Sequence, residues 1–317
     1  MKANLTLLIC AVLSFSSGAM AAQPGTGIGD LKFRTAKVDG LTIFYREAGN
    51  PAKPAILLLH GFPSTSHMYD GLINDLAGKY HLIAPDYPGF GNSSKPDPSV
   101  FVYSFDHIAA IMVHFIETIG LRKFSLYMQD YGGPIGFRIA SAYPGKINAL
   151  IIQNANAYTA GLGDGFNKIM KMEQAGDEKG VANILHQIIS LDGIKVQYTQ
   201  GAANLDNIAP ETYLTDFYYV QRPGNADIQA TLFYDYHNNL TQYQVWQRYF
   251  KEHQPPALIV WGKNDPIFTA PGANAYRQDL PGAEIHLLNG GHFALVEYHR
   301  EIAAYIISFL QKKALNN

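Results

Sequence analysis

Short apolar runs alternate with stretches of helical periodicity along most of the chain. Continuous or nearly continuous apolar runs cover residues 55–59, 81–85, 124–129, 147–153 and 257–261, and a further strand is expected at 284–288. Helical patterns occupy about 104–119 and 300–312. Apolar strands separated by helices are typical of a largely parallel sheet that is covered by helices on both faces. Upstream, residues 35–38 and 42–46 flank Asp39-Gly40, which predicts a β-hairpin.

The alternation of strands and helices stops between residues 158 and 254. This segment has helical patterns interrupted by glycine-containing turns, no clear buried strand, and many tyrosines. We predict a helical cap over residues 158–254, inserted into an α/β core formed by residues 22–157 and 255–317. Such a cap is expected over the carboxyl edge of the sheet, where open α/β folds bind ligands.

The candidate chemistry centres on the segment 124–138. Its apolar run ends abruptly at Gln129-Asp130, and Gly132-Gly133 opens a helical pattern. A strand, a tight turn and a helix in this order form an elbow that presents one side chain, here Asp130, from a strained turn. The glycines are expected because the turn leaves no room for Cβ atoms beside the helix. An aspartate before two glycines is also a common turn residue, so this reading depends on the residues around it.

Two further side chains supply the rest of a hydrolytic mechanism. A carboxylate suits attack on an sp3 carbon that bears a leaving group, which forms an alkyl ester on the protein. His292, in Asn-Gly-Gly-His-Phe after the last strand, is the candidate base that activates water against this ester. Asp265, in Asn-Asp-Pro after the preceding strand, is placed to orient that histidine, although it would also suit a helix cap.

The order of elbow, cap, Asp265 and His292, with His60-Gly-Phe-Pro63 upstream, resembles the α/β-hydrolase fold. The Gln-Asp-Tyr-Gly-Gly elbow is similar to the branch with an aspartate nucleophile, which holds epoxide hydrolases and haloalkane dehalogenases. The resemblance covers nearly the whole mature chain and matches the cap only in places. It implies that the backbone N–H groups of Phe62 and Tyr131 form an oxyanion hole.

The leaving group distinguishes the substrates of this branch. Opening an epoxide develops an alkoxide that needs proton or hydrogen-bond donors, and tyrosines in the cap suit that role. The sequence around Tyr236 resembles the cap motif of epoxide hydrolases, with His237 in place of the usual arginine, and Tyr158 is our candidate for the second phenol. Dehalogenases typically place a tryptophan after the nucleophile, where this chain has Tyr131. Some keep the acid that orients the histidine after the strand 147–153, where this chain has no acidic residue.

Composition and charge limit the kinds of binding partner that we expect. The 317 residues are 47% hydrophobic and 16% charged, with a formal net charge of -2, which gives no electrostatic reason to expect nucleic acid or an anionic membrane. The histidines are scattered and have no cysteine partners, so we predict no metal site. Water would be the only co-substrate of a hydrolase, so we predict no cofactor. Residues 1–21 have the charged start, apolar stretch and small-residue end of a signal peptide, which predicts a periplasmic or secreted protein without membrane attachment once mature.

We therefore predict a hydrolase that acts on a small apolar electrophile with water through an ester of Asp130, favouring an epoxide that becomes a diol. The alternatives are dehalogenation of an alkyl halide and, from another class, a non-catalytic protein that keeps the fold and binds a ligand. The sequence leaves the oligomeric state open.

Overall fold

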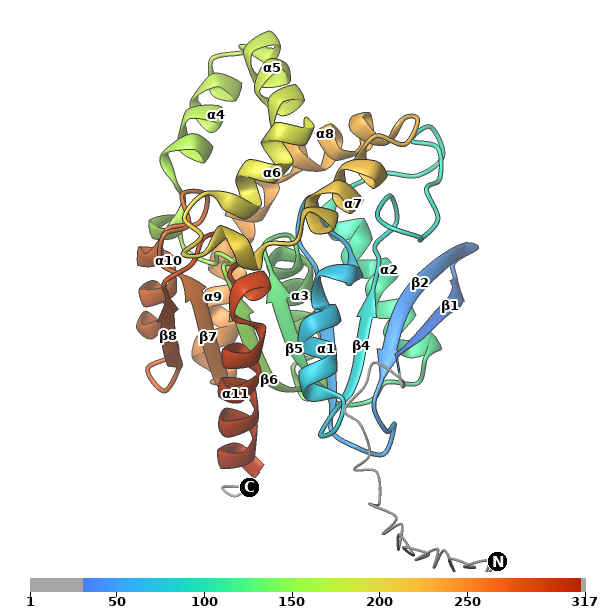
Figure 1. Ribbon diagram of the computed structural model, residues 1–317, viewed down its shortest axis with the longest axis vertical. Helices are drawn as coiled ribbons and strands as arrows, with labels where there is room; N and C mark the ends of the chain where they lie inside the picture. Colours follow the sequence, from blue (N-terminus) through green and yellow to red (C-terminus); the bar gives the residue numbers. More distant parts are fainter. Residues whose placement is uncertain (1–30, 315–317) are drawn as a thin grey trace, which may run out of the picture.

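The computed structural model describes residues 31–314, and the predicted α/β architecture is confirmed (Figure 1). The expected signal peptide, residues 1–21, lies outside the described residues. Within them, eight strands form one sheet in the order β1-β2-β4-β3-β5-β6-β7-β8. The strands are β1 (Lys32–Val38), β2 (Leu41–Ala48), β3 (Ala55–Leu59), β4 (His81–Pro85), β5 (Phe124–Gln129), β6 (Ile147–Gln153), β7 (Ala257–Gly262) and β8 (Glu284–Leu288).

The first two strands form the predicted hairpin. Strand β1 pairs antiparallel with β2 through Val38 opposite Leu41. The turn residues Asp39 and Gly40 have φ values of 49° and 79°, the left-handed pair that a two-residue hairpin requires. Strand β2 is also antiparallel to β4, whereas every pairing from β4 to β8 is parallel.

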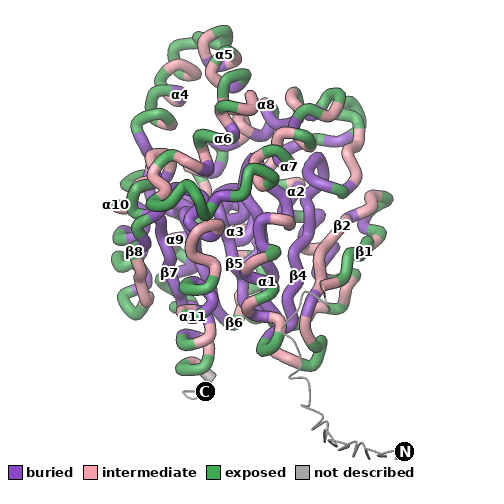
Figure 2. The backbone as a smooth tube through the Cα atoms, viewed as in Figure 1, coloured by how far each residue is buried: buried purple, intermediate pink, exposed green. Residues whose placement is uncertain are grey.

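Strands β3, β5 and β7 are buried along their whole length, as Figure 2 shows in purple at the centre of the molecule. Their continuous apolar sequences follow from this position, because helices cover both faces of the sheet (Figure 1). Helices α1 and α11 pack together on one face, and α2, α3 and α9 lie on the other. The helices of the core are α1 (Asp70–Leu76), α2 (Phe105–Thr118), α3 (Gly132–Ala142), α9 (His237–His253), α10 (Ala270–Ala275) and α11 (Ala294–Ala314).

The segment between β6 and β7 contains no strand of the sheet and projects above its carboxyl edge (Figure 1). Its upper part consists of α4 (Asp164–Gln174), α5 (Glu178–Ile188), α6 (Leu191–Thr199), α7 (Pro210–Val220) and α8 (Asn225–Asp235). Helix α9 differs, because it packs against α3 of the core, with Phe137 in aromatic contact with Trp246 and Phe250. The range 158–254 that we assigned to the cap therefore includes one helix that belongs to the core layers.

Candidate active site

Asp130 occupies a strained turn at the carboxyl end of β5. Its φ of 50° is left-handed, which is costly for a residue other than glycine and is typical of functional sites. The turn is as tight as predicted, because a Cβ on Gly132 would lie 2.1 Å from the Leu59 carbonyl oxygen. A Cβ on Gly133 would lie 2.7 Å from that of Ala155. The Phe62 N–H donates to Oδ1 of Asp130 over 2.7 Å, so one predicted oxyanion donor already holds this carboxylate.

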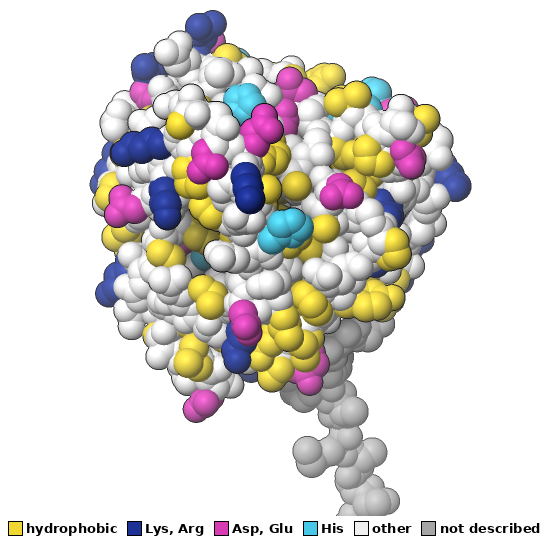
Figure 3. All heavy atoms as spheres, turned by 90° about the horizontal axis from the view of Figure 1, so that it is seen from above, with side chains coloured by type: hydrophobic (Ala, Val, Ile, Leu, Met, Phe, Trp, Pro, Cys, Tyr) yellow, Lys and Arg dark blue, Asp and Glu magenta, His cyan; other side chains and the backbone are white. Residues whose placement is uncertain are grey.

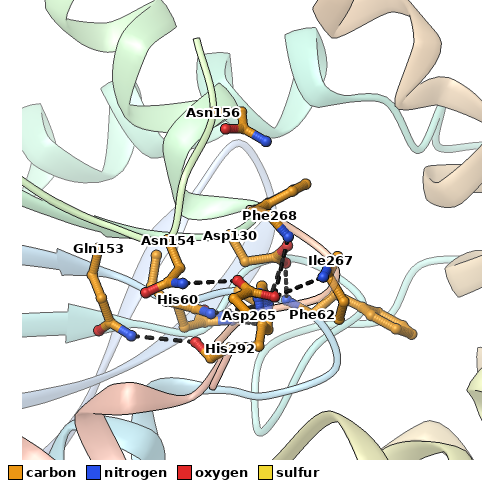
Figure 4. Close-up of polar contacts among 12 residues, drawn as sticks. His60, Phe62, Asp130, Gln153, Asn154, Asn156, Asp265, Ile267, Phe268 and His292 are labelled. Atoms are coloured by element: carbon orange, nitrogen blue, oxygen red, sulfur yellow. Dashed lines mark hydrogen bonds and ion pairs between the residues drawn. The ribbon is translucent and has the colours of Figure 1, made fainter. Parts of the chain in front are cut away.

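His292 lies between two carboxylates (Figure 4). Its Nε2 is 3.6 Å from Oδ2 of Asp130, and its Nδ1 is 2.8 Å from Oδ2 of Asp265. Burial opposes protonation of this imidazole, but the charge of Asp265 and the contacts with Asp130 outweigh it and raise the pKa of His292 to about 10. The three residues that we singled out on separate strand ends thus meet as one buried chain of polar contacts.

Asp265 is held on both oxygens. Oδ1 accepts hydrogen bonds from the backbone N–H groups of Ile267 and Phe268 over 2.7 and 3.1 Å. Oδ2 accepts a second hydrogen bond, over 2.8 Å, from the side-chain amide of Asn154 (Figure 4). Asp265 therefore also has the bonding expected of a cap, because its Oδ1 accepts from backbone N–H groups of its own turn.

Sequence reasoning missed Asn154 and Gln129 as parts of this site. Asn154 directly follows β6, has a left-handed φ of 40°, and also accepts from the Gly262 N–H through its Oδ1. Gln129 precedes Asp130, and its Nε2 lies 3.2 Å from Nε2 of His292. Both are buried amides at the carboxyl ends of strands. A polar amide at the end of an apolar run is the feature of the sequence that indicates a place in the site.

The two tyrosine candidates differ in position. Tyr236, which follows α8, lines the same cavity as Asp130, and its buried hydroxyl lies beside that of Tyr243. Tyr158 does not line this cavity, because its hydroxyl points to Asp279 and donates to Oδ2 over 2.8 Å. Our assignment of Tyr158 to the ring-opening pair was therefore wrong. Tyr131 does line the cavity.

The cavity has a volume of about 710 Å³ and extends from Asp130 into the cap. Its base consists of core residues and Tyr236, and its walls are mostly apolar side chains of α4, α5 and α6 such as Ile169, Ile188 and Val196. Lys168 and Asp192 lie at its exposed rim and carry opposite charges. Figure 3 shows the cap side, with hydrophobic side chains in a hollow and charged groups scattered around it. The cavity thus suits an apolar ligand, and its rim carries charges of both signs.

A second polar cluster joins the core to the cap. His67 Nε2 lies 2.6 Å from Oδ1 of Asp216, a fully buried carboxylate on α7. The Tyr198 hydroxyl of α6 donates to the other oxygen of Asp216, and its ring stacks on Phe293 at 3.9 Å between centroids. His67 follows the loop of Phe62, and Phe293 follows His292, so this cluster links the cap to both loops.

Other polar residues near the site have structural partners. His60 is fully buried and stacks on Tyr87 with ring centroids 4.0 Å apart. Asp86 accepts from the N–H groups of Ser66 and Asn92 over 2.8 Å each, and its carbonyl accepts from the Ser93 hydroxyl. These residues tie down the loops around the site.

Within residues 31–314, no three histidine, cysteine or acidic side chains are grouped so that they could hold a metal ion. The same part of the chain has no helix that combines the length and apolar character needed to cross a membrane.

Comparison with known proteins places this geometry in context. The family described as "alpha/beta hydrolase fold" matches residues 54–297. An uncharacterized hydrolase from Saccharomyces cerevisiae is 39% identical over 273 residues, which covers 85% of this chain and 93% of that protein. A haloalkane dehalogenase from Psychrobacter cryohalolentis is 27% identical over 290 residues, covering 85% and 88%. The crystal structure of a haloalkane dehalogenase from Bradyrhizobium elkani superposes with a TM-score of 0.75 at 19% identity, over 91% of this chain and 100% of that one.

Proposed function

Because the chain belongs to the α/β-hydrolase family, we propose that it is a hydrolase of epoxides that works through an ester of Asp130. One observation carries the proposal: the residue on the elbow is a carboxylate, in contact with His292 and at the base of an apolar cavity. A serine at this position would attack acyl carbons, whereas a carboxylate attacking an acyl carbon would form an anhydride. The elbow therefore favours an sp3 carbon as the electrophile.

In the first step, an Asp130 oxygen attacks an epoxide carbon and forms a C–O bond. The ring C–O bond breaks, and its electron pair goes to the ring oxygen, which takes a proton from the Tyr236 phenol and becomes a hydroxyl group. The phenolate regains a proton, by way of water, from the His292 imidazolium ion of the free protein, so the imidazole is neutral when the second step begins. The Phe62 N–H holds Oδ1 of Asp130 and leaves Oδ2, on the side of His292, as the attacking atom. The carboxylate is therefore oriented before the substrate binds.

In the second step, water attacks the carbonyl carbon of the ester. The negative charge then develops on the carbonyl oxygen, for which the N–H groups of Phe62 and Tyr131 are the donors. His292 takes the proton of the water, and Asp265 stabilises the imidazolium ion that results. The bond between the acyl carbon and the alkyl oxygen breaks, and the departing oxygen takes the second proton of the attacking water. The diol leaves, and Asp130 is restored as a carboxylate.

Esterification of Asp130 also changes His292 from an acid into a base. In the free protein, two carboxylates stabilise the imidazolium ion, and Asp130 is one of them. The ester is neutral, so its formation removes that contribution and lowers the pKa of His292. The histidine thus becomes able to accept a proton at the stage of the reaction that requires it.

The leaving group favours an epoxide over a halide. The cavity offers the phenol of Tyr236, which suits a developing alkoxide. A halide usually meets N–H donors, but Trp246 and Trp261 are fully buried and do not line the cavity. Dehalogenation remains the second candidate, because a haloalkane dehalogenase is 27% identical over most of the chain. A non-catalytic ligand-binding role is disfavoured by the assembled Asp130, His292 and Asp265.

The cavity supports an apolar substrate larger than the epoxide group itself. Its volume of about 710 Å³ lies within the range of roughly 300–1,000 Å³ for small-molecule sites. Neutral apolar substrates also agree with the mixed charges of the rim. We further propose that the protein is exported to the periplasm or secreted, on the basis of the signal-peptide pattern in residues 1–21.

A single turnover in oxygen-18 water tests the mechanism. With enzyme in excess over an alkyl epoxide, the ester route takes the new diol oxygen from Asp130, so the diol stays unlabelled and the protein gains the label. Halide release from the matching alkyl bromide, without diol formation from the epoxide, would favour the second candidate. Label in the first-turnover diol would contradict the ester route.

A further inference from the structure

Gln129 places a buried amide beside the ring of His292. It is the last residue of β5, and its side chain is fully buried. Its Nε2 lies 3.2 Å from Nε2 of His292, whereas Oδ2 of Asp130 lies 3.6 Å from the same ring nitrogen. The amide is therefore the nearer of these two polar groups and lies within hydrogen-bond distance of the ring.

The oxygen of this amide has no hydrogen-bond partner among the described residues. It lies against Gly61, where a Cβ would collide both with this oxygen and with Cβ of Asp130. A buried carbonyl oxygen without a donor is costly and rare in folded proteins. Rotation of the amide group exchanges the positions of its oxygen and its nitrogen. That rotation would bring the unpaired Oε1 of Gln129 into the contact with His292.

The protonation of His292 decides which amide atom suits this contact. Burial lowers the pKa of the imidazole, but Asp265 and Asp130 outweigh burial and raise the pKa to about 10. These two carboxylates are the charged groups beside the ring, and its aromatic neighbours are Phe268 and Phe293. The ring of the free protein therefore carries hydrogen on both nitrogens. An amide nitrogen would oppose the Nε2–H with hydrogens of its own, whereas the amide oxygen accepts it.

We propose that Gln129 is a positioning residue, whose Oε1 accepts the Nε2–H of the His292 imidazolium ion and directs it away from Oδ2 of Asp130. Its effect on the reaction rests on the proposed function. In the first step, Oδ2 keeps its lone pairs free for attack on the ring carbon. In the second step, Gln129 stabilises the new imidazolium ion at Nε2, as Asp265 does at Nδ1. Gln129 does not line the cavity, so it acts through His292.

Gln153 provides a matched control on the neighbouring strand. Gln129 and Gln153 pair in register between β5 and β6, and both are fully buried. The amide of Gln153 donates to the backbone oxygen of His292 over 3.4 Å and accepts from the Tyr127 hydroxyl over 2.6 Å. It contacts the backbone of His292 and not the ring. Replacement of either glutamine by methionine thus removes a buried amide at the same level of the sheet, but only position 129 should affect the ring.

The direction of a pKa change tests this role without any substrate. NMR titration of the His292 ring compares the wild type with Gln129→Met, Gln129→Glu and Gln153→Met. Gln129→Met should lower the pKa of His292 by about 1–2, because the imidazolium ion loses an acceptor. Gln129→Glu keeps an acceptor without a donor, so the pKa should stay at or above that of the wild type. Gln153→Met should leave it unchanged.

Two outcomes of the titration would overturn the assignment. A raised pKa in Gln129→Met would mean that Nε2 of Gln129 donates to the neutral ring, and an unchanged pKa would mean that the amide only packs there. If Gln129→Met does not fold, Gln129→Glu decides alone, and a pKa below that of the wild type contradicts the acceptor role.

Stopped-flow hydrolysis of the ester adds a kinetic readout. In Gln129→Met, the rate should be about 10-fold lower at its plateau, and it should level off at a lower pH than in the wild type. A rate and pH profile equal to those of the wild type would contradict the role of Gln129 in the second step. Failure of the wild type to form an ester with an alkyl epoxide would overturn the proposed function, and the titration would still decide whether Gln129 accepts from His292.

Discussion

The side-chain amide of Asn154 donates to Oδ2 of Asp265 over 2.8 Å, and the same oxygen faces His292. Asn154 directly follows β6, and Asp265 lies in the loop after the neighbouring strand β7. A polar side chain after each of two adjacent strands thus contributes to one contact with His292. The amide is neutral and balances no charge, but its hydrogen bond provides Oδ2 of Asp265 with a donor from the end of β6.

This contact predicts that the carboxylate that orients His292 can be moved from position 265, after β7, to position 154, after β6. Asp265→Asn should lower the rate of ester hydrolysis about 10³- to 10⁴-fold, because the imidazole loses its orienting carboxylate. The double variant Asp265→Asn, Asn154→Asp returns a carboxylate to the site and should recover at least about 10-fold. Stopped-flow hydrolysis of the preformed ester measures both rates. Asn154→Asp alone is the control, and it should also slow hydrolysis, because two carboxylates would then be in contact.

The role of Asp130 in the protonation of His292 gives a titration experiment. The pKa of His292 is raised to about 10, and the Asp130 carboxylate is one of the groups that raise it. Asp130→Asn imitates the neutral ester, so it should lower the pKa of His292, as followed by NMR of the imidazole. In the wild type, hydrolysis of the ester should then speed up as pH rises and level off below pH 10, since the base must be neutral. An unchanged pKa in Asp130→Asn would contradict this switch.

The contact between His67 and Asp216 predicts a pH-dependent stability of the cap. Burial lowers the pKa of His67, but its hydrogen bond and charge interaction with Asp216 outweigh this and raise it. A raised folded-state pKa gives a stabilisation that is complete below the ordinary value near 6.5 and is lost as pH rises through the folded-state value. His67→Gln should therefore lower the free energy of unfolding by about 1–3 kcal/mol near pH 6, and by less at higher pH.

Urea unfolding at several pH values measures this difference between the wild type and His67→Gln. The matched control is His114→Gln, which breaks the contact of His114 with Asp39, where both side chains are about half exposed. An exposed pair contributes little, so this control should change the stability by less than about 1 kcal/mol. A loss in His67→Gln that grows with pH would contradict the assignment.

The apolar walls of the cavity predict a dependence on substrate length. Each methylene group that enters the cavity should add about 0.8 kcal/mol of binding, or up to about 4-fold in kcat/KM, until the chain reaches the rim. A series of terminal alkyl epoxides measures this slope. Ile188→Ser places a hydroxyl in the wall and should reduce the gain for long chains while sparing the shortest member. A flat series would mean that the upper cavity does not hold substrate.

Much of this account follows from sequence patterns, for reasons that differ between elements. The strands of the core are visible because burial on both faces requires uninterrupted apolar residues, as in β3 and β5. The elbow is visible because Gly132 and Gly133 reflect close backbone contacts of the turn itself. The hairpin at Asp39-Gly40 is likewise a local effect, set by the left-handed conformation of two residues.

The parts that could not be predicted depend on contacts between distant segments. Tyr158 and Tyr236 look alike in sequence, and only the proximity of Asp279 removes Tyr158 from the cavity. Helix α9 follows the cap without a break, and its packing on α3 separates it from the other inserted helices.

The most direct test of the central claim is the mass of a His292→Gln variant after exposure to an alkyl epoxide. Removal of the base should stop the second step, so that the ester accumulates. We predict that the protein gains the mass of one whole epoxide and that peptide mapping places it on Asp130. Asp130→Asn in the same background is the control and should gain nothing. An unmodified protein, or an adduct on another residue, would contradict the mechanism.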